Sequence, residues 1–142
     1  MAGPRMSRRQ GRKRALDILY EADLRGRPTA TVLAGQLSAD DPPGDFTVDL
    51  VRGVHRNRGQ LDRLIESYAR DWKLARMPVV DRNLLRIGLF EILHVDDVPT
   101  AVAIDEAVDL AKELSTDDSG RFVNGVLARI ADAHAPPNTP DN

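Results

Sequence analysis

Apolar residues recur along the chain at intervals of three, four and seven, which places them on one face of an α-helix. The first stripe consists of Leu16, Leu19 and Ala22, and the last runs from Val123 to Ile130. No stretch alternates apolar and polar residues for long, as a half-buried strand would. The sequence therefore predicts an all-α protein of six or seven helices.

Loops and prolines divide this pattern into segments. Loops are expected at residues 40–44, 95–99 and 115–118. Met77-Pro78 marks a break, because the residue before a proline disfavours helical backbone. Between the first loop and this break, the apolar positions form one long helical stripe over residues 46–72.

Two further features locate helices within the fold. Residues 84–93 are apolar on most of the helix surface, so this helix is expected at the centre of the core. Asp45 and Asp118 are predicted N-caps, since a carboxylate can accept the free amides of a first helical turn.

The expected organisation is one domain over residues 7–134, made of two small helical bundles packed together. The sub-bundles are expected at about residues 7–76 and 77–134. A basic arm, residues 1–14, begins the chain, and residues 135–142 are expected to form a disordered tail.

The charge of the chain is unevenly distributed. Residues 1–14 carry a net charge of +6, whereas the rest of the chain carries −8. On a helix, the arginines of the arm share one face that continues into Leu16 and Leu19. These arginines are Arg5, Arg8, Arg9 and Arg12. Because guanidinium groups cannot be buried without partners, the first two turns are expected to project from the body or to stay frayed until a polyanion orders them, and Gly11 favours fraying.

Charge alone leaves several functions open for the arm. It is compatible with a solvated N-terminus, with nucleic-acid binding, and with binding to an acidic protein or a membrane surface. Phe122 is a second candidate, either as a platform for a stacked base with Arg121 beside it for phosphate, or as an ordinary core residue. Residues 96–118 contain eight acids, which suits a basic protein partner.

No catalytic, metal or cofactor site is expected. Cysteine is absent, and the three histidines lack the spacing of a zinc site. Phosphate-binding glycine loops and nucleophile elbows are also absent. No apolar run approaches the roughly 18 residues of a membrane helix, and Asp17 and Glu21 interrupt any signal peptide. The expected class is a soluble, cytoplasmic protein that is not an enzyme.

Three segments carry a resemblance to a known family. They are residues 14–20 (RALDILY), residues 81–91 (DRNLLRIGLFE), and residues 98–112 (VPTAVAIDEAVDLAK) with residues 121–127 (RFVNGVL). Together they resemble the NusB family of transcription antitermination factors, over about residues 7–133.

The resemblance implies a function and a set of partners. It implies an all-α fold of two bundles and RNA binding at the boxA element of ribosomal RNA leader transcripts. It also implies a protein partner, the small-subunit ribosomal protein NusE, and loading onto the transcription elongation complex. Some members of the family are homodimers.

The resemblance and the charge pattern together predict site residues. The RNA-binding residues are expected to be Arg5, Arg8, Arg9, Arg12, Lys13, Arg14, Asp118, Arg121 and Phe122. Tyr20 and Asp81 match positions near the NusE surface. A rival hypothesis is a non-catalytic protein-interaction module or homodimer in which RNA binding is weak or masked.

Overall fold

The computed structural model describes residues 7–70 and 72–134. In chain order, the elements are α1 (Arg8–Arg25), α2 (Thr29–Leu37), α3 (Asp45–Arg56), α4 (Arg58–Tyr68), the short 3₁₀ helix η1 (Leu74–Arg76), α5 (Val79–His94), α6 (Thr100–Leu114) and α7 (Asp117–His134). Within the described ranges there is no strand, so the predicted all-α class is confirmed. The predicted tail, Arg5 and the start of the arm lie outside the described residues.

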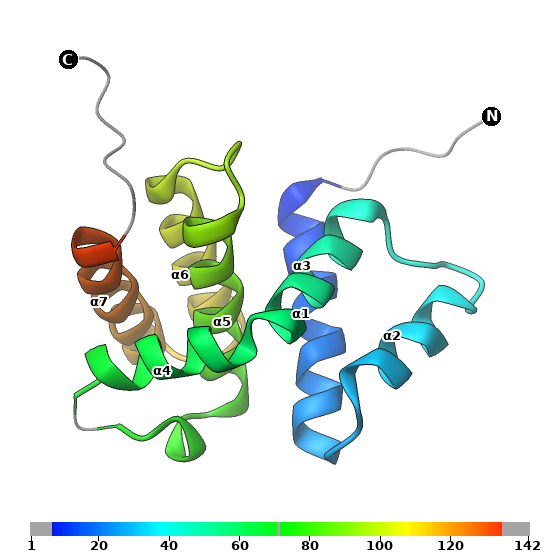
Figure 1. Cartoon of the computed structure of the whole chain (residues 1–142), viewed down its shortest axis with the longest axis horizontal. Helices are drawn as coiled ribbons and strands as arrows, with labels where there is room; N and C mark the ends of the chain where they lie inside the picture. The colour runs from blue at the N-terminus through cyan, green and yellow to red at the C-terminus, as the bar shows by residue number, and fades with distance from the viewer. Residues whose placement is uncertain (1–6, 71, 135–142) are drawn as a thin grey trace.

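The helices form two groups that share one core (Figure 1). Helices α1, α2 and α3 pack on one another, while α4, α6 and α7 surround α5. Helix α5 contacts helices of both groups, including α1 and α3, so its predicted central position is confirmed. Because α4 packs on α5 and α7, the chain passes from one group to the other at Asn57.

The stripe predicted as one long helix over residues 46–72 is two helices joined at Asn57, so that prediction is wrong. The Asn57 side chain donates to the Gly53 carbonyl at 2.8 Å and terminates α3. Gly53 lets α3 approach α5 closely, because a Cβ there would lie 2.0 Å from Phe90 Cζ. Trp72 lies beyond the end of α4 and is 50% exposed. The bend keeps the apolar side chains on the core side, which is why their spacing does not reveal it.

The N-terminus of helix α1 is capped, contrary to the expected fraying. Ser7 and Gln10 form a capping box, in which each side chain bonds the other residue's backbone amide. Gly11 is buried, and a Cβ there would lie only 3.0 Å from the Phe46 ring. The Gly11 carbonyl also accepts a hydrogen bond from Thr47 Oγ1 at 2.8 Å. Gly11 therefore permits close packing of α1 on α3.

The predicted N-caps are displaced by one or two residues. Gly44, not Asp45, precedes α3 as its N-cap. Helix α7 begins at Asp117, and the amide of Ser119 donates to Thr116 Oγ1 at 2.9 Å. Asp45 and Asp118 instead lie in the first turns, where negative charge complements the helix dipole.

The other end of α1 is joined to α5 by an ion-pair network. Asp23 accepts hydrogen bonds from Arg82 at 2.6 and 2.7 Å and from Arg86 at 3.1 Å. Burial would raise the pKa of Asp23, but the hydrogen bonds from Arg82 and Asn83 and the charges of Arg82 and Arg86 outweigh it and lower the pKa to about 2. Arg86 also bonds Asp62 of α4 at 2.8 Å, so the network ties three helices together.

Candidate nucleic-acid interface

Three basic residues of α1, Arg8, Arg9 and Lys13, pair with acids of α6 and of the loop before it instead of projecting from the body. Arg8 Nη2 lies 2.8 Å from Asp97 Oδ2, in the loop before α6. Arg9 bonds both Glu106 at 2.9 Å and Asp109 at 2.8 Å. The bond between Arg8 and Asp97 raises the pKa of the guanidinium and lowers that of the carboxyl. The expected free arm is therefore wrong for residues 8–14, because side chains and a loop elsewhere in the fold provide partners for its cations.

Arg12 is the deepest member of this row. Its side chain is 4% exposed and that of Glu91 on α5 is 1% exposed. The guanidinium contacts both carboxylate oxygens, with Arg12 Nη2 at 2.7 Å from Oε1 and Nε at 2.9 Å from Oε2. Burial raises the pKa of Glu91 against the opposing effect of Arg12. Arg12 thus joins α1 to α5 through a buried ion pair. A side chain buried to this extent does not fit the predicted role of Arg12 in binding RNA.

Lys13 and Arg14 point in two different directions. Lys13 Nζ lies 2.7 Å from Glu113 near the end of α6, and this hydrogen bond raises the pKa of Lys13. Arg14 donates to the Asp41 carbonyl at 2.6 Å and to the Gln36 side chain at 2.9 Å. Lys13 therefore extends the row along α6, whereas Arg14 holds the loop between α2 and α3.

Phe46 is a member of the interface that the sequence pattern assigned only to the core. The guanidinium carbons of Arg8 and Arg12 lie 4.7 Å and 5.3 Å from the centroid of its ring. Such cation–π contacts hold a guanidinium over a ring face. Phe46 on α3 thus orients the first arginines of α1.

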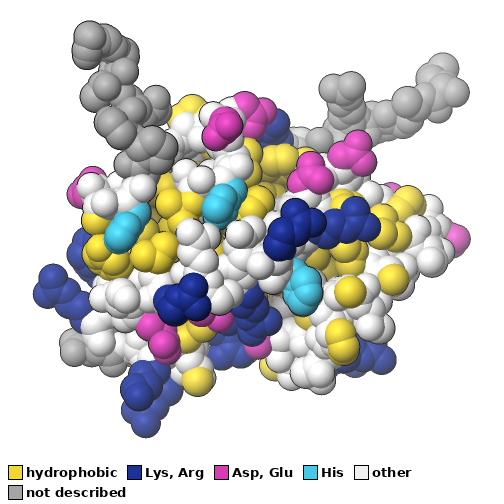
Figure 2. All heavy atoms as spheres, viewed as in Figure 1, with side chains coloured by type: hydrophobic (Ala, Val, Ile, Leu, Met, Phe, Trp, Pro, Cys, Tyr) yellow, Lys and Arg dark blue, Asp and Glu magenta, His cyan; other side chains and the backbone are white. Residues whose placement is uncertain are grey.

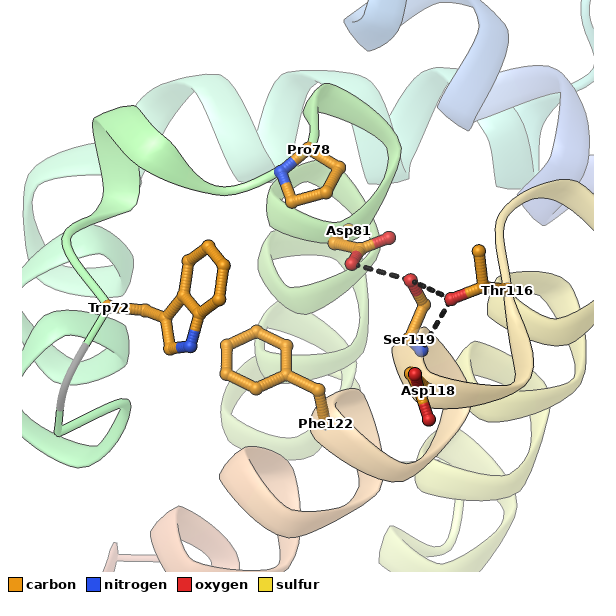
Figure 3. Close-up of a pocket in the computed structure, with 7 residues that line it drawn as sticks. All are labelled: Trp72, Pro78, Asp81, Thr116, Asp118, Ser119 and Phe122. Carbon is orange, nitrogen blue, oxygen red and sulfur yellow. Dashed lines mark hydrogen bonds between the residues drawn. The ribbon is translucent and has the colours of Figure 1, made fainter.

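A cavity of about 290 Å³ opens at the end of α6 where α7 begins (Figure 3). Trp72, Pro78 and Phe122 form its apolar side, with the Trp72 and Phe122 ring centroids 6.2 Å apart. Its polar lining comes from Asp81, Thr116, Asp118 and Ser119. Phe122 packs against the core and is also partly accessible, so its core role is confirmed and its role as a platform for a base stays a prediction.

The predicted residues around this cavity differ in accessibility. Asp118 and Arg121 form an exposed ion pair on the first turn of α7. Asp81 is 3% exposed and accepts a hydrogen bond from Ser119 Oγ at 2.7 Å, so it is buried in the cavity wall and does not belong to an open partner surface. Tyr20 is half-buried on α1.

Arg8, Arg9 and Lys13, called here the basic row, pair with acids along α6, and the cavity opens at the end of that helix. Glu113, the partner of Lys13, is three residues before Thr116, which lines the cavity. Across the face shown in Figure 2, positive, negative and apolar side chains are interspersed.

Among the described residues, no cluster of three or more metal-binding side chains occurs, and no helix is long and apolar enough to cross a membrane.

Comparison with known proteins gives the family of this chain. A model of the NusB family matches residues 9–132. The chain belongs to the NusB family. A relative described as transcription antitermination protein NusB, from Saccharopolyspora erythraea, is 59% identical over 128 residues, which cover 88% of this chain and 86% of the relative.

Solved NusB structures share the fold. Thermotoga maritima NusB matches with a TM-score of 0.83 at 36% identity, covering 94% of this chain and 96% of that one. A structure of antitermination factors NusB and NusE in complex with double-stranded RNA matches with a TM-score of 0.74 at 28% identity. The match covers 91% of this chain and 100% of the matched chain.

Three parts of the site in this NusB-family chain were missed by the sequence pattern. Trp72 was assigned to a helix face, Phe46 to the core, and the α6 acids to a partner surface. A signal for the acids was present, because Glu106, Asp109 and Glu113 fall on one helical face. Their spacing matches that of Arg9 and Lys13 on α1.

Proposed function

We propose that this chain is an RNA-binding transcription antitermination factor that acts with the ribosomal protein NusE in the transcription elongation complex. The observation that carries the proposal is a row of exposed cations on α1 paired along α6, together with a cavity at the end of α6 that is lined by two aromatic side chains. The relatives named as antitermination proteins, and the similar structure of NusB and NusE with RNA, support it.

Arg8, Arg9 and Lys13 are the proposed phosphate contacts. Their side chains are 49%, 49% and 46% exposed, and they pair in order with Asp97, Glu106 and Glu113, from the loop before α6 to the end of that helix. Contacts with the phosphates of a nucleic acid fix its position without reading its sequence. Recognition of a boxA-type RNA therefore requires contacts with the bases, and this specificity stays a prediction from the family resemblance.

Phe122 and Trp72 are the proposed contacts with the bases. Phe122 offers a ring that is partly accessible, and the Trp72 ring lies beside it on the apolar side of the cavity. Aromatic side chains bind unstacked bases of single-stranded RNA in this way. Arg121 and Asp118 at the rim, both exposed, are placed to contact the nucleotides entering the cavity.

The rival hypothesis of an acidic surface for a basic partner loses support from the ion pairs. Of the eight acids in residues 96–118, Asp97, Glu106, Asp109, Glu113 and Asp118 are already paired with cations of this chain. We propose that NusE binds elsewhere, near the half-buried Tyr20 of α1. The proposed role is non-catalytic and cytoplasmic, without a cofactor.

The salt dependence of RNA binding tests the basic row. We expect R8A/R9A/K13A to reduce the slope of log K against log salt by up to about 2, since each phosphate contact contributes at most roughly 0.7. The matched control is R25A/R56A/R63A, which removes the same charge from exposed positions on α1, α3 and α4. Equal slopes for the two triple variants would refute the assignment of phosphate contacts.

A titration with a boxA-type RNA and a scrambled RNA, each with and without NusE, tests the function as a whole. We expect NusE to increase the preference for the boxA-type RNA. Binding of NusE with no detectable RNA affinity under any condition would favour the protein-interaction module instead.

Trp72 provides a direct probe of the cavity, because it is the only tryptophan of the sequence. We expect RNA binding to change its fluorescence, and F122A to weaken binding by about 1–3 kcal/mol. Urea unfolding of F122A is the control. An RNA affinity equal to that of the wild type in a folded F122A variant would contradict the stacking role.

A further inference from the structure

The charge of the α1–α6 face differs from the charge that its basic segment suggests. Within the described residues, the ion pairs along this face join four cations to five carboxylates. These are Arg8, Arg9, Arg12 and Lys13, with Glu91, Asp97, Glu106, Asp109 and Glu113. A phosphate approaching this face therefore meets cations that are already neutralised by acids of the same chain.

The pairs differ in burial. The pair of Arg12 and Glu91 is almost inaccessible, at 4% and 1% exposure. Glu106, which pairs with both Arg9 and Arg12, is intermediate at 19%. The pairs of Asp97, Asp109 and Glu113 are about half exposed or more, as Lys13 and Glu113 show at 46% and 49%. Exposed ion pairs contribute little to stability and are screened by salt, whereas breaking a buried pair is costly. The outer cations are thus free to exchange partners, while Arg12 stays bound to Glu91.

We infer that the acids of the α6 face, Asp97, Asp109 and Glu113, are built-in competitors that lower RNA affinity by occupying the phosphate-binding cations of α1. This inference rests on the proposed RNA-binding function. RNA binds by exchange: a phosphate displaces Asp97 from Arg8, Asp109 from Arg9 or Glu113 from Lys13, while the less exposed Glu106 stays bonded to Arg9. The buried Arg12–Glu91 pair holds α1 in place during the exchange and has a positioning role.

The exchange has a consequence for salt dependence. A phosphate that binds a cation releases the counterions condensed on the RNA. A carboxylate that loses its partner in the same step attracts a cation from solution, which offsets part of that release. The wild-type slope should therefore be shallower than the number of phosphate contacts implies, and removal of the acids should steepen it.

The test compares two variants with the same change of charge. D97N/D109N/E113Q neutralises the competing acids, and D40N/D49N/D132N neutralises exposed acids on the α2–α3 loop, α3 and α7. An exposed pair is worth up to about a fivefold change in an equilibrium constant, so we expect the first variant to bind single-stranded RNA roughly threefold to a hundredfold tighter and with a steeper salt slope. The control should gain only the small effect of total charge.

A third variant separates competition from simple repulsion. When D97N/D109N/E113Q is combined with R8A/R9A/K13A, the gain should disappear, because no cation remains to be released. A gain that persists in this background, or one equal to that of the control, would overturn the inference.

These outcomes are distinguishable from failure of the proposed function. If the wild-type chain binds RNA and R8A/R9A/K13A flattens its salt slope, the phosphate contacts stand whatever the acid variants do. If neither result is obtained, the RNA-binding proposal fails first, and the inference fails with it.

Discussion

The buried pair of Arg12 and Glu91 makes a sharp prediction about the division between folding and RNA binding. Removing one partner of a buried ion pair leaves an uncompensated charge, at a cost of about 3–5 kcal/mol. Arg12 bonds both oxygens of Glu91, and the two side chains are 4% and 1% exposed, so we expect R12M to lose stability within this range. E91M should lose less, because Glu106 Oε1 lies 3.5 Å from Arg12 Nη1 and keeps a partner for the guanidinium.

The double variant R12M/E91M should recover most of this loss. Replacement of a buried ion pair by apolar side chains of similar volume is often neutral or stabilising. The measurement is urea unfolding at pH 7, followed by circular dichroism, with the midpoint and slope of each transition compared across the cycle. A loss below about 1 kcal/mol for R12M, or additive losses in the double variant, would refute the burial argument.

The pH dependence of R12M provides an independent check. Burial already raises the pKa of Glu91, and loss of Arg12 removes the hydrogen bonds and charge that oppose this effect. The folded variant then binds a proton more readily than the unfolded chain, so its stability falls as pH rises. We expect the deficit of R12M relative to the wild type to shrink as pH is lowered from 7 to 5.

The same double variant also tests the role of Arg12 in RNA binding. If Arg12 only positions α1, R12M/E91M should retain the wild-type salt slope. A slope reduced by about 0.7 would mean that Arg12 contacts a phosphate, as its position in the basic segment first predicted.

Two further predictions concern stability. G53A should lower the free energy of unfolding, measured in urea, by about 1–3 kcal/mol or more, because the added Cβ would lie 2.0 Å from Phe90 Cζ. G35A, with open space around the added Cβ, should raise it by up to about 1 kcal/mol. Equal effects of the two substitutions would contradict the close approach of α3 and α5. The pKa of Asp23 is lowered from 3.8 to about 2, so its ionisation should contribute about 2 kcal/mol to the free energy of unfolding. This contribution is present above pH 4 and is lost as the pH falls from 3.8 to 2. D23N should therefore be less stable than the wild type at pH 7 and approach it at low pH, and a difference that does not vary with pH would show that the charge of Asp23 is not responsible.

Local patterning predicted most of the helical architecture. The spacing of Leu16, Leu19 and Ala22 correctly indicated the buried face of α1, because helix periodicity depends only on nearby residues. The apolar surface of residues 84–93 likewise placed α5 at the centre. The break at Asn57 was missed, since a bend that keeps apolar residues on the core side leaves their spacing unchanged.

The candidate site was predicted less completely, because its parts come from different helices. The sequence identified Arg8, Arg9, Lys13 and Phe122 as candidates but not Trp72, which joins Phe122 only after the chain turns back beyond α4. Asp81 was expected near a partner, yet Ser119 of α7 holds it within the cavity wall. These contacts depend on which helices become neighbours.

The pattern of apolar residues decided that the chain is helical and which side of each helix is buried. The concentration of positive charge in residues 8–14 was equally plain from the sequence. Only the tertiary structure decided that this charge lies against Glu106, Asp109 and Glu113 of α6. The reason is that charge is a property of each residue, whereas its neutralisation depends on residues about 100 positions away that the fold brings within hydrogen-bonding distance.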